Sequence, residues 1–394
     1  MPTRSRAAAA AAFFAQGLVF ISLTTRLPDF QDRWDLSELE LSVLLLMLVL
    51  LAGAGSVVAE RLARRRPSGL LLRGGLLLVA ATLPVVALAP TRPVFVLGLA
   101  GYGVALGVID ASTNMQAVAL EHRYGRPILP SFHGAWTAGG ITGAAVTLAT
   151  SELPLGAVAG LLVLPLAVAF GPFLARDDGP VDPSLPDVAW RPILLVGLGM
   201  VVFYLVDTAS TTWGAVYLDD VFDTPEGLVA LATFPYLVAS LVVRLSGDGL
   251  VRRYGAVLVL RVGAVVGCLG LLLVVAAPTW PVAVVGFTVT GAGVAVIAPL
   301  SFSAAARIAG GSQARVDAVI ARFNQFNYVG ALFGAVLTGV VGQDSLRYGF
   351  AVPMVLVLAC CPLPARSRPL RRPPPRLRTC PIRESPSTST STTW

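Results

Sequence analysis

The chain contains little charge and no lysine. Charged residues make up 13% of its 394 positions, whereas soluble domains carry roughly 25%. Hydrophobic residues make up 55%, and the mean hydropathy is +0.76. Such a chain cannot cover a water-exposed surface with polar side chains, so lipid must form part of its solvent. The composition excludes an ordinary soluble domain and predicts an integral membrane protein.

All of the positive side-chain charge comes from 29 arginines, which give the chain a net charge of +7. These arginines are scattered in short segments between apolar runs and form no basic patch of the kind that binds nucleic acid. Retention at an anionic inner leaflet explains them better. We therefore expect membrane lipid, and no nucleic acid, as a partner.

Cysteine and histidine are also scarce, with four and two copies. The spacing of Cys268, Cys360, Cys361 and Cys380 fits neither a disulfide framework nor a metal site. The motifs H-E-x-x-H, G-x-S-x-G and the P-loop do not occur. We therefore expect no catalytic residues, no metal and no bound cofactor.

One pattern favours an enzyme instead. Residues 219–223 read DDVFD, a form that binds magnesium diphosphate in prenyl-transfer enzymes, and residues 177–182 are a looser copy. Both clusters would have to surround one metal–phosphate group. The sequence predicts a single membrane crossing between them, which puts them on opposite sides. Solvated acidic loops are the better interpretation, and a membrane-embedded prenyl-transfer enzyme is a remote alternative.

Long apolar runs predict an all-α membrane protein with twelve transmembrane helices. A helix needs about 20 mainly apolar residues to cross the hydrocarbon core. A Pro/Arg-rich and then Ser/Thr-rich tail at 364–394, which we expect to be disordered, follows the last run. The runs fall at 7–28, 38–59, 69–89, 93–115, 130–150, 154–175, 192–217, 227–246, 255–277, 281–305, 316–341 and 346–363.

The segments between the runs predict the orientation. With the N-terminus inside, the inner segments hold fifteen arginines, Arg244 among them, and the outer segments hold four, the tail excluded. This asymmetry follows the positive-inside rule. Because twelve is even, both termini are expected on the cytoplasmic side.

Two stretches repeat at one offset. Glu60 and Asp248 each precede a basic cluster and are 188 residues apart, and the same offset aligns Gly103–Asp110 with Gly291–Ala298. Parallel repeats of this kind place the substrate site at the midplane between two halves. The duplication predicts six-helix halves at 1–175 and 192–363, joined by a cytoplasmic linker at 176–191.

Small residues recur four apart on several runs. Gly139 with Gly143, and Gly330 with Gly334, are such pairs. Small residues at this spacing let two membrane helices approach closely. Both pairs are therefore predicted to lie at helix contacts.

The loop at Ser56–Arg66 resembles the inner loop between helices 2 and 3 of the major facilitator superfamily, G-x-L-A-D-R-x-G-R-R. Ser56 and Ala63 replace its two glycines, and Glu60 replaces its Asp. The resemblance implies a gate latch in which the acid pairs with a neighbouring helix end. The implied latch residues of both copies are Glu60, Arg61, Arg64, Arg65, Asp248, Arg252 and Arg253.

A narrower resemblance covers most of the chain. Gly107–Gly140, with D-x-x-x-N followed by G-R-P and F-H-G, is similar to the fucose-permease-like branch, which includes bacterial YbjJ-type inner-membrane proteins. Asp207–Leu218 resembles that branch's E-G-x-x-x-D-W-S-x-x-Y-L, with Thr212 in place of the second acid. The resemblance implies a bacterial cytoplasmic membrane protein that transports a sugar-like solute.

Two acids, Asp110 and Asp207, lie deep within predicted spans. A charge at this depth costs several kcal/mol, so such residues are functional candidates by default. Asn114 follows Asp110 by four positions and shares its helix face. Burial favours the protonated form of a carboxylate, so Asp110 is a candidate for proton binding. A protonated or capped acid that only packs helices is the alternative for both.

Further polar residues extend the candidate site. A histidine titrates near neutral pH, so His133 could relay a proton to Asp110, although a lone histidine at a helix start is more often only hydrogen-bonded locally. Asn324, Asn327 and Tyr328 form a polar stripe at i, i+3 and i+4, for which interhelical hydrogen bonding is the rival explanation. The other candidates are Trp136, Gln16 and Trp213.

These features together predict a monomeric secondary transporter that works by alternating access. The resemblance implies a small, polar, sugar-like solute, and a proton is expected as the coupling ion. Export of drugs or metabolites by the same fold is the alternative, because the predicted cavity has few charges.

Overall fold

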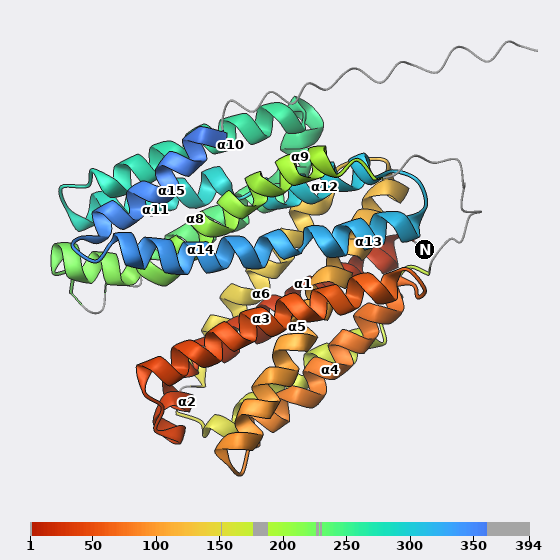
Figure 1. Cartoon of the computed structure of the whole chain (residues 1–394), viewed down its shortest axis with the longest axis horizontal. Helices are drawn as coiled ribbons and strands as arrows, with labels where there is room; N and C mark the ends of the chain where they lie inside the picture. The colour runs from red at the N-terminus through yellow and green to blue at the C-terminus, as the bar shows by residue number, and fades with distance from the viewer. Residues whose placement is uncertain (1, 151, 176–187, 226–227, 229–230, 361–394) are drawn as a thin grey trace, which may run out of the picture. The chain divides into compact units, whose positions relative to one another are not determined.

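The computed structural model describes residues 2–150, 152–175, 188–225, 228 and 231–360, and within these ranges every regular element is helical. Figure 1 shows the long helices running side by side. The predicted tail at 364–394 and most of the predicted linker at 176–191 lie outside the described residues, as does the acidic stretch 177–182.

Six crossing segments make up the N-terminal group of helices. The short 3₁₀ helix η1 continues directly into α7, and the two form one segment. A short helix, α2, which the sequence analysis did not predict, precedes α3. The elements are α1 (Pro2–Thr25), α2 (Leu27–Trp34), α3 (Glu38–Ala63), α4 (Ser68–Leu88), α5 (Arg92–Tyr124), α6 (Leu129–Ala149), η1 (Leu155–Leu162) and α7 (Val163–Ala169).

Six more segments make up the C-terminal group. Two of them are broken at their centres, α11 from α12 and α13 from α14. The elements are α8 (Trp190–Phe222), α9 (Phe234–Tyr254), α10 (Ala256–Val275), α11 (Trp280–Val294), α12 (Ile297–Ala309), α13 (Gln313–Phe323), α14 (Gln325–Val341) and α15 (Leu346–Cys360).

The twelve predicted spans correspond to these twelve segments. Eight helices of the described chain are long and apolar enough to cross a membrane, and Leu155–Ala169 and Leu346–Val357 are shorter apolar helices. The runs predicted at 281–305 and 316–341 are confirmed as helical segments, and each contains a short break, at residues 295–296 and at Asn324. The span predicted at 227–246 was misplaced. Its helix, α9, runs from Phe234 to Tyr254, because Arg244 was taken for the inner boundary.

The two groups share a packing motif. A Cβ added at Gly139 or Gly143 of α6 would overlap backbone carbonyl oxygens of α1. A Cβ added at Gly330 or Gly334 of α14 would overlap carbonyl oxygens of α8 in the same way. The prediction of close helix contacts at both pairs is confirmed. Each group therefore packs its first segment against its fifth through glycine.

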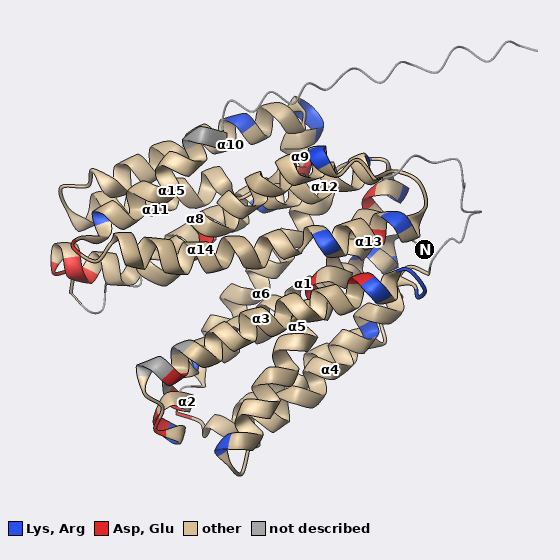
Figure 2. Cartoon of the chain, in the orientation of Figure 1, with Lys and Arg blue, Asp and Glu red and all other residues tan. Residues whose placement is uncertain are grey.

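Arginines gather at one end of the bundle (Figure 2). We call it the basic end and define it by the turns that follow α3, α5 and α9. Of the arginines predicted outside, Arg33 and Arg347 donate to carbonyls at the ends of α4 and α10, and Arg26 donates at the end of α6. A cation at a helix C-terminus is favourable. These exceptions to the charge rule are therefore helix caps.

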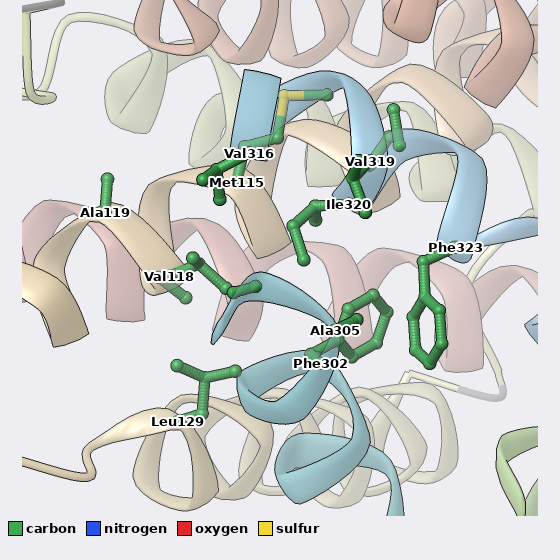
Figure 3. Close-up of a cluster of buried hydrophobic side chains, with 14 of the residues drawn as sticks. Met115, Val118, Ala119, Leu129, Phe302, Ala305, Val316, Val319, Ile320 and Phe323 are labelled. Carbon is green, nitrogen blue, oxygen red and sulfur yellow. The ribbon is translucent and has the colours of Figure 1, made fainter. Parts of the chain in front are cut away.

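A hydrophobic cluster joins the two groups near the basic end. Figure 3 shows side chains of α12 and α13, including Phe302 and Ile320, packed against Met115 and Val118 of α5 and Leu129 of α6. All five residues are fully or almost fully buried. The hairpin α12–α13 is therefore seated in the N-terminal group.

Candidate functional site

Asp110 of α5 is the centre of the most extensive polar contact in the bundle's interior. Its Oδ1 accepts a hydrogen bond from Gln16 Nε2 at 3.1 Å. Its Oδ2 accepts from Asn324 Nδ2 at 2.8 Å, Asn327 Nδ2 at 3.0 Å and the Tyr328 hydroxyl at 3.0 Å. The structure thus brings together five of the residues that the sequence analysis singled out. Three of the four donors come from the other group of helices.

The break between α13 and α14 positions these donors. Asn324 is the residue between the two helices, and Asn327 and Tyr328 lie in the first turn of α14. Asp110 therefore accepts from three side chains at the junction of α13 and α14.

The other predicted candidates lie apart from this carboxylate. Asn114 donates to the Asp110 backbone carbonyl at 2.9 Å. His133 is buried between the rings of Phe13 and Phe302, its Nε2 has no hydrogen-bond partner, and no described hydrogen bond joins it to Asp110. A direct relay through His133 has no hydrogen-bonded path here.

Both predicted tryptophans also make local contacts. The Trp136 ring lies 6.3 Å from that of Phe20. Trp213 donates from Nε1 to the Ala335 carbonyl at 2.9 Å, which fixes it between α8 and α14.

Asp207 of α8 has a simpler environment than Asp110. Its Oδ1 accepts from the Tyr236 hydroxyl at 2.7 Å, and Tyr236 lies on α9 of the same group. A change of charge on Asp207 would therefore alter a bond within one group, whereas a change on Asp110 would alter bonds between the groups.

The implied latch acids both bridge the groups at the basic end. Glu60 of α3 accepts from Arg64 at 3.2 Å and from Arg322 of α13 at 3.1 Å. Asp248 of α9 accepts from Arg6 of α1 at 3.3 Å and from the Ser131 backbone amide of α6 at 3.0 Å. Each acid thus contacts the opposite group.

The cations that complete these bridges were not predicted as latch residues. Arg322 and Arg6 pair across long sequence distances, and no local motif marks such pairing. Arg61, Arg65, Arg252 and Arg253 are exposed, so the acids and not the basic clusters make the described bridges.

Arg244 is the residue that sequence reasoning misplaced. It was counted in an inner loop, but it lies ten residues from each end of α9. At 1.5 Å per residue this is about 15 Å from either end, the middle of a membrane crossing. Its side chain is buried, donates from Nε to the Ala295 carbonyl at 3.2 Å and from Nη1 to Thr137 Oγ1 at 2.5 Å, and stacks 5.8 Å from the Phe203 ring centre.

Pro299 explains part of this arrangement. Proline has no amide hydrogen, so Pro299 cannot donate to the carbonyl four residues earlier, that of Ala295. This carbonyl lies at the break between α11 and α12 and accepts from Arg244 instead. The signals that could have drawn attention to the pair are an arginine inside one predicted span and a proline inside another.

All described hydrogen bonds and ion pairs between the two groups lie between the middle of the bundle and the basic end. The deepest are those of Asp110, the Arg244–Thr137 bond and the bond from Gln325 to the Gly53 carbonyl at 3.2 Å. The described contacts therefore close the bundle at the basic end.

A cavity of about 250 Å³ lies at the basic end, lined by Ser68, Gln116, His122 and Gln313 among others. None of its lining residues contributes to the Asp110 or Arg244 contacts. It is therefore separate from the candidate site.

The acids of the enzyme-like pattern lie elsewhere. Asp219 and Asp220 are exposed at the end of α8, which agrees with a solvated acidic segment.

Comparisons with solved structures identify the fold. The structure superposes on the E. coli fucose:proton symporter FucP with a TM-score of 0.75 at 16% identity, covering 90% of this chain and 96% of that one. A bacterial homologue of the iron transporter ferroportin in an outward-facing state gives a TM-score of 0.71 at 16% identity, covering 91% and 98%. Both show a shared twelve-helix fold.

Sequence comparisons agree. The model of the Major Facilitator Superfamily matches residues 195–385. The uncharacterized transporter y4wD of Sinorhizobium fredii is 30% identical over 308 residues, 75% of this chain and 81% of the relative. An uncharacterized MFS-type transporter of Yersinia pestis is 29% identical over 360 residues, 88% and 91%. The recognition of the superfamily is confirmed. This chain belongs to the Major Facilitator Superfamily of membrane transporters.

Proposed function

We propose that this protein is a proton-coupled secondary transporter of a small polyhydroxylated solute, in which Asp110 carries the proton. The observation that carries the proposal is the Asp110 carboxylate, which accepts three hydrogen bonds from the opposite group of helices. Hydrogen bonds to an ionised acceptor are roughly twice as strong as those between neutral groups. The charge on Asp110 therefore strengthens the contact between the groups.

Proton uptake changes that contact. A protonated Asp110 accepts weaker bonds, and its own proton competes for the space that the donors of α13 and α14 occupy. The groups then separate more easily at the basic end. Asp207 is less suited to this role because its donor, Tyr236, belongs to its own group.

The same residues suit a polyhydroxylated solute. Amide and phenol groups such as those of Gln16, Asn327 and Tyr328 both donate and accept hydrogen bonds, as sugar hydroxyls do. The fold shared with a fucose:proton symporter supports the same class. We infer from the positive-inside rule that the basic end faces the cytoplasm, and that both termini lie on that side.

The test is solute-driven proton movement in proteoliposomes that carry a pH-sensitive dye in the lumen. We expect the wild type to acidify the lumen when L-fucose, D-galactose, D-galacturonate, D-glucitol or D-gluconate is added, for at least one of these solutes. Asp110→Asn should abolish acidification but retain exchange of labelled solute, because an amide holds no transferable proton. Asp207→Asn is the matched control and should still acidify.

Two outcomes would overturn the proposal. Acidification that persists in Asp110→Asn would exclude Asp110 as the proton carrier. Solute uptake by the wild type without any acidification would mean that the transporter is not coupled to protons.

A further inference from the structure

Arg244 places a positive charge at the centre of the bundle without a described carboxylate in direct contact with it. Its side chain is buried, with 6% of the residue exposed, and no described carboxylate lies within ion-pair distance of its guanidinium. Its described partners are a backbone carbonyl, a hydroxyl and an aromatic ring. A buried charge is costly unless an opposite charge accompanies it.

The two nearby acids do not supply that charge through a described contact. Asp207 lies one helical turn after Phe203 on α8, but its described bond is to Tyr236. Asp110 is surrounded by neutral donors. The described hydrogen-bond partners of the cation and of both carboxylates are therefore all neutral.

A comparison with Arg73 separates this arrangement from a helix cap. Arg73 also donates to two carbonyls, those of Ala169 and Gly171, and lies 5.6 Å from the Phe173 ring centre. It lies near the end of α7, five residues after the start of α4. An arginine can therefore cap a helix from a position close to a helix end. Capping alone does not explain why Arg244 lies at the middle of the membrane.

The position of Arg244 matches that of a ligand site. It lies at mid-helix on α9, contacts Thr137 of the other group and abuts the break between α11 and α12. Substrate sites of transporters built from repeats lie at the midplane between the repeats and next to interrupted helices. The described hydrogen bonds occupy Nε and Nη1, and none of them involves Nη2.

We propose that Arg244 is an anion-binding residue of the solute site, and that the solute carries a carboxylate. A guanidinium binds a carboxylate with two parallel hydrogen bonds. The solute would place its carboxylate on Arg244 and its hydroxyls on the amide and phenol groups around Asp110. This assignment rests on the proposed transport function and narrows its substrate class to sugar acids.

The experiment compares acids with their neutral counterparts by thermal shift of the purified full-length protein. The probes are D-galacturonate against D-galactose and D-gluconate against D-glucitol, titrated at constant ionic strength. We expect at least one acid to stabilise the wild type at a concentration tenfold or more below that of its neutral counterpart. Arg244→Gln should remove this difference, and Arg244→Lys should reduce it because an ammonium cannot form the paired bonds. Arg73→Gln is the matched control and should retain it.

Each result decides the assignment. If neither acid stabilises the wild type more than its counterpart does, the solute is not a sugar acid and the proposal fails, even if Arg244→Gln does not fold. If the preference for an acid survives in Arg244→Gln, the anion binds elsewhere. Proton-coupled uptake of a neutral sugar would overturn this inference and leave the proposed function intact. Arg244-dependent binding of an acid without proton movement would overturn proton coupling alone.

Discussion

The two groups of helices follow one frame, but the C-terminal group breaks its helices where the N-terminal group does not. α5 is continuous over 33 residues, whereas the segment 188 residues later divides into α11 and α12. α6 is likewise continuous, and its counterpart divides into α13 and α14. The N-terminal group thus supplies a rigid carboxylate, and the C-terminal group supplies donors mounted on interrupted helices.

Each break has a buried ionisable side chain beside it. Arg244 donates to the Ala295 carbonyl at the break between α11 and α12. Asp110 accepts from Asn324 and Asn327 at the break between α13 and α14. The helix packing is therefore the feature that the two groups share. The buried polar residues lie where the two groups differ.

The shared frame can be broken through its glycines, with the largest expected effect. Gly139→Val and Gly330→Val each force a side chain against a backbone carbonyl of the facing helix. Overpacking costs about 1–3 kcal/mol and sometimes more. Overlap with a backbone carbonyl, which cannot move aside as a flexible side chain can, puts these variants at or above the upper end of that range. Both should lower the thermal unfolding temperature in detergent. Gly74→Val and Gly199→Val, where an added Cβ meets open space, are the controls. Equal effects in variants and controls would contradict close glycine packing.

The interrupted helices can be tested through one donor from each group. Asn327→Ala removes a bond to Asp110 from the opposite group, and Gln16→Ala removes one from the same group. A hydrogen bond to a charged group contributes about 1.5–3 kcal/mol, so both should lower stability at neutral pH. Only Asn327→Ala should also increase amide exchange in α13, measured by mass spectrometry. Equal exchange in the two variants would argue against a contact that holds the groups together.

The latch acids offer a smaller and more symmetric effect. Glu60→Gln removes the pair with Arg322, and Asp248→Asn removes the pair with Arg6. The cations are partly exposed, so water screens these pairs and each loss should stay at or below about 1 kcal/mol. We expect faster amide exchange near the basic end in both variants. Unchanged exchange in both would show that the hydrophobic cluster alone closes this end.

The smallest expected effect is a pH dependence of stability that comes from Glu40, at the end of the bundle opposite the basic end. Hydrogen bonds from the Ser37 backbone amide and from Arg92 lower the pKa of Glu40 to about 2. Because the pKa of Glu40 is lower in the folded than in the unfolded chain, the ionised carboxylate stabilises the folded state. This stabilisation is fully present above the unfolded pKa of 4.5 and is lost as the pH falls toward 2. The unfolding temperatures of the wild type and Glu40→Gln should therefore differ at pH 7 and converge below pH 4.5. A constant difference would contradict the assignment.

The sequence predicted the fold well because hydrophobic runs and their periodicity are local signals. It also singled out Asp110, Asn324, Asn327, Tyr328 and Gln16, because polar residues inside apolar runs are costly and therefore conspicuous. It did not predict that these five would converge on one carboxylate, since that depends on packing between distant helices.

The errors had a common physical cause. Arginine was assumed to mark the membrane surface, so the predicted span ended near Arg244. The position of Arg244 at the middle of α9 was therefore not predicted. The helix breaks were missed because one, at Asn324, has no proline beside it, and the other depends on Pro299 together with a distant cation. Charged residues inside membranes are placed by their partners, and the chain alone does not identify those partners.

The central claim is that the charge of Asp110 holds the groups together at the basic end. Nitroxide labels at Arg126→Cys and Tyr254→Cys, both exposed positions on opposite groups, would report the distance between the groups by electron spin resonance. We predict that acidification populates a longer distance in the protein that retains Asp110. With Asp110→Asn the longer distance should be populated at every pH. A distance distribution that shifts with pH equally in the presence and absence of Asp110, or that shifts in neither, would contradict the claim.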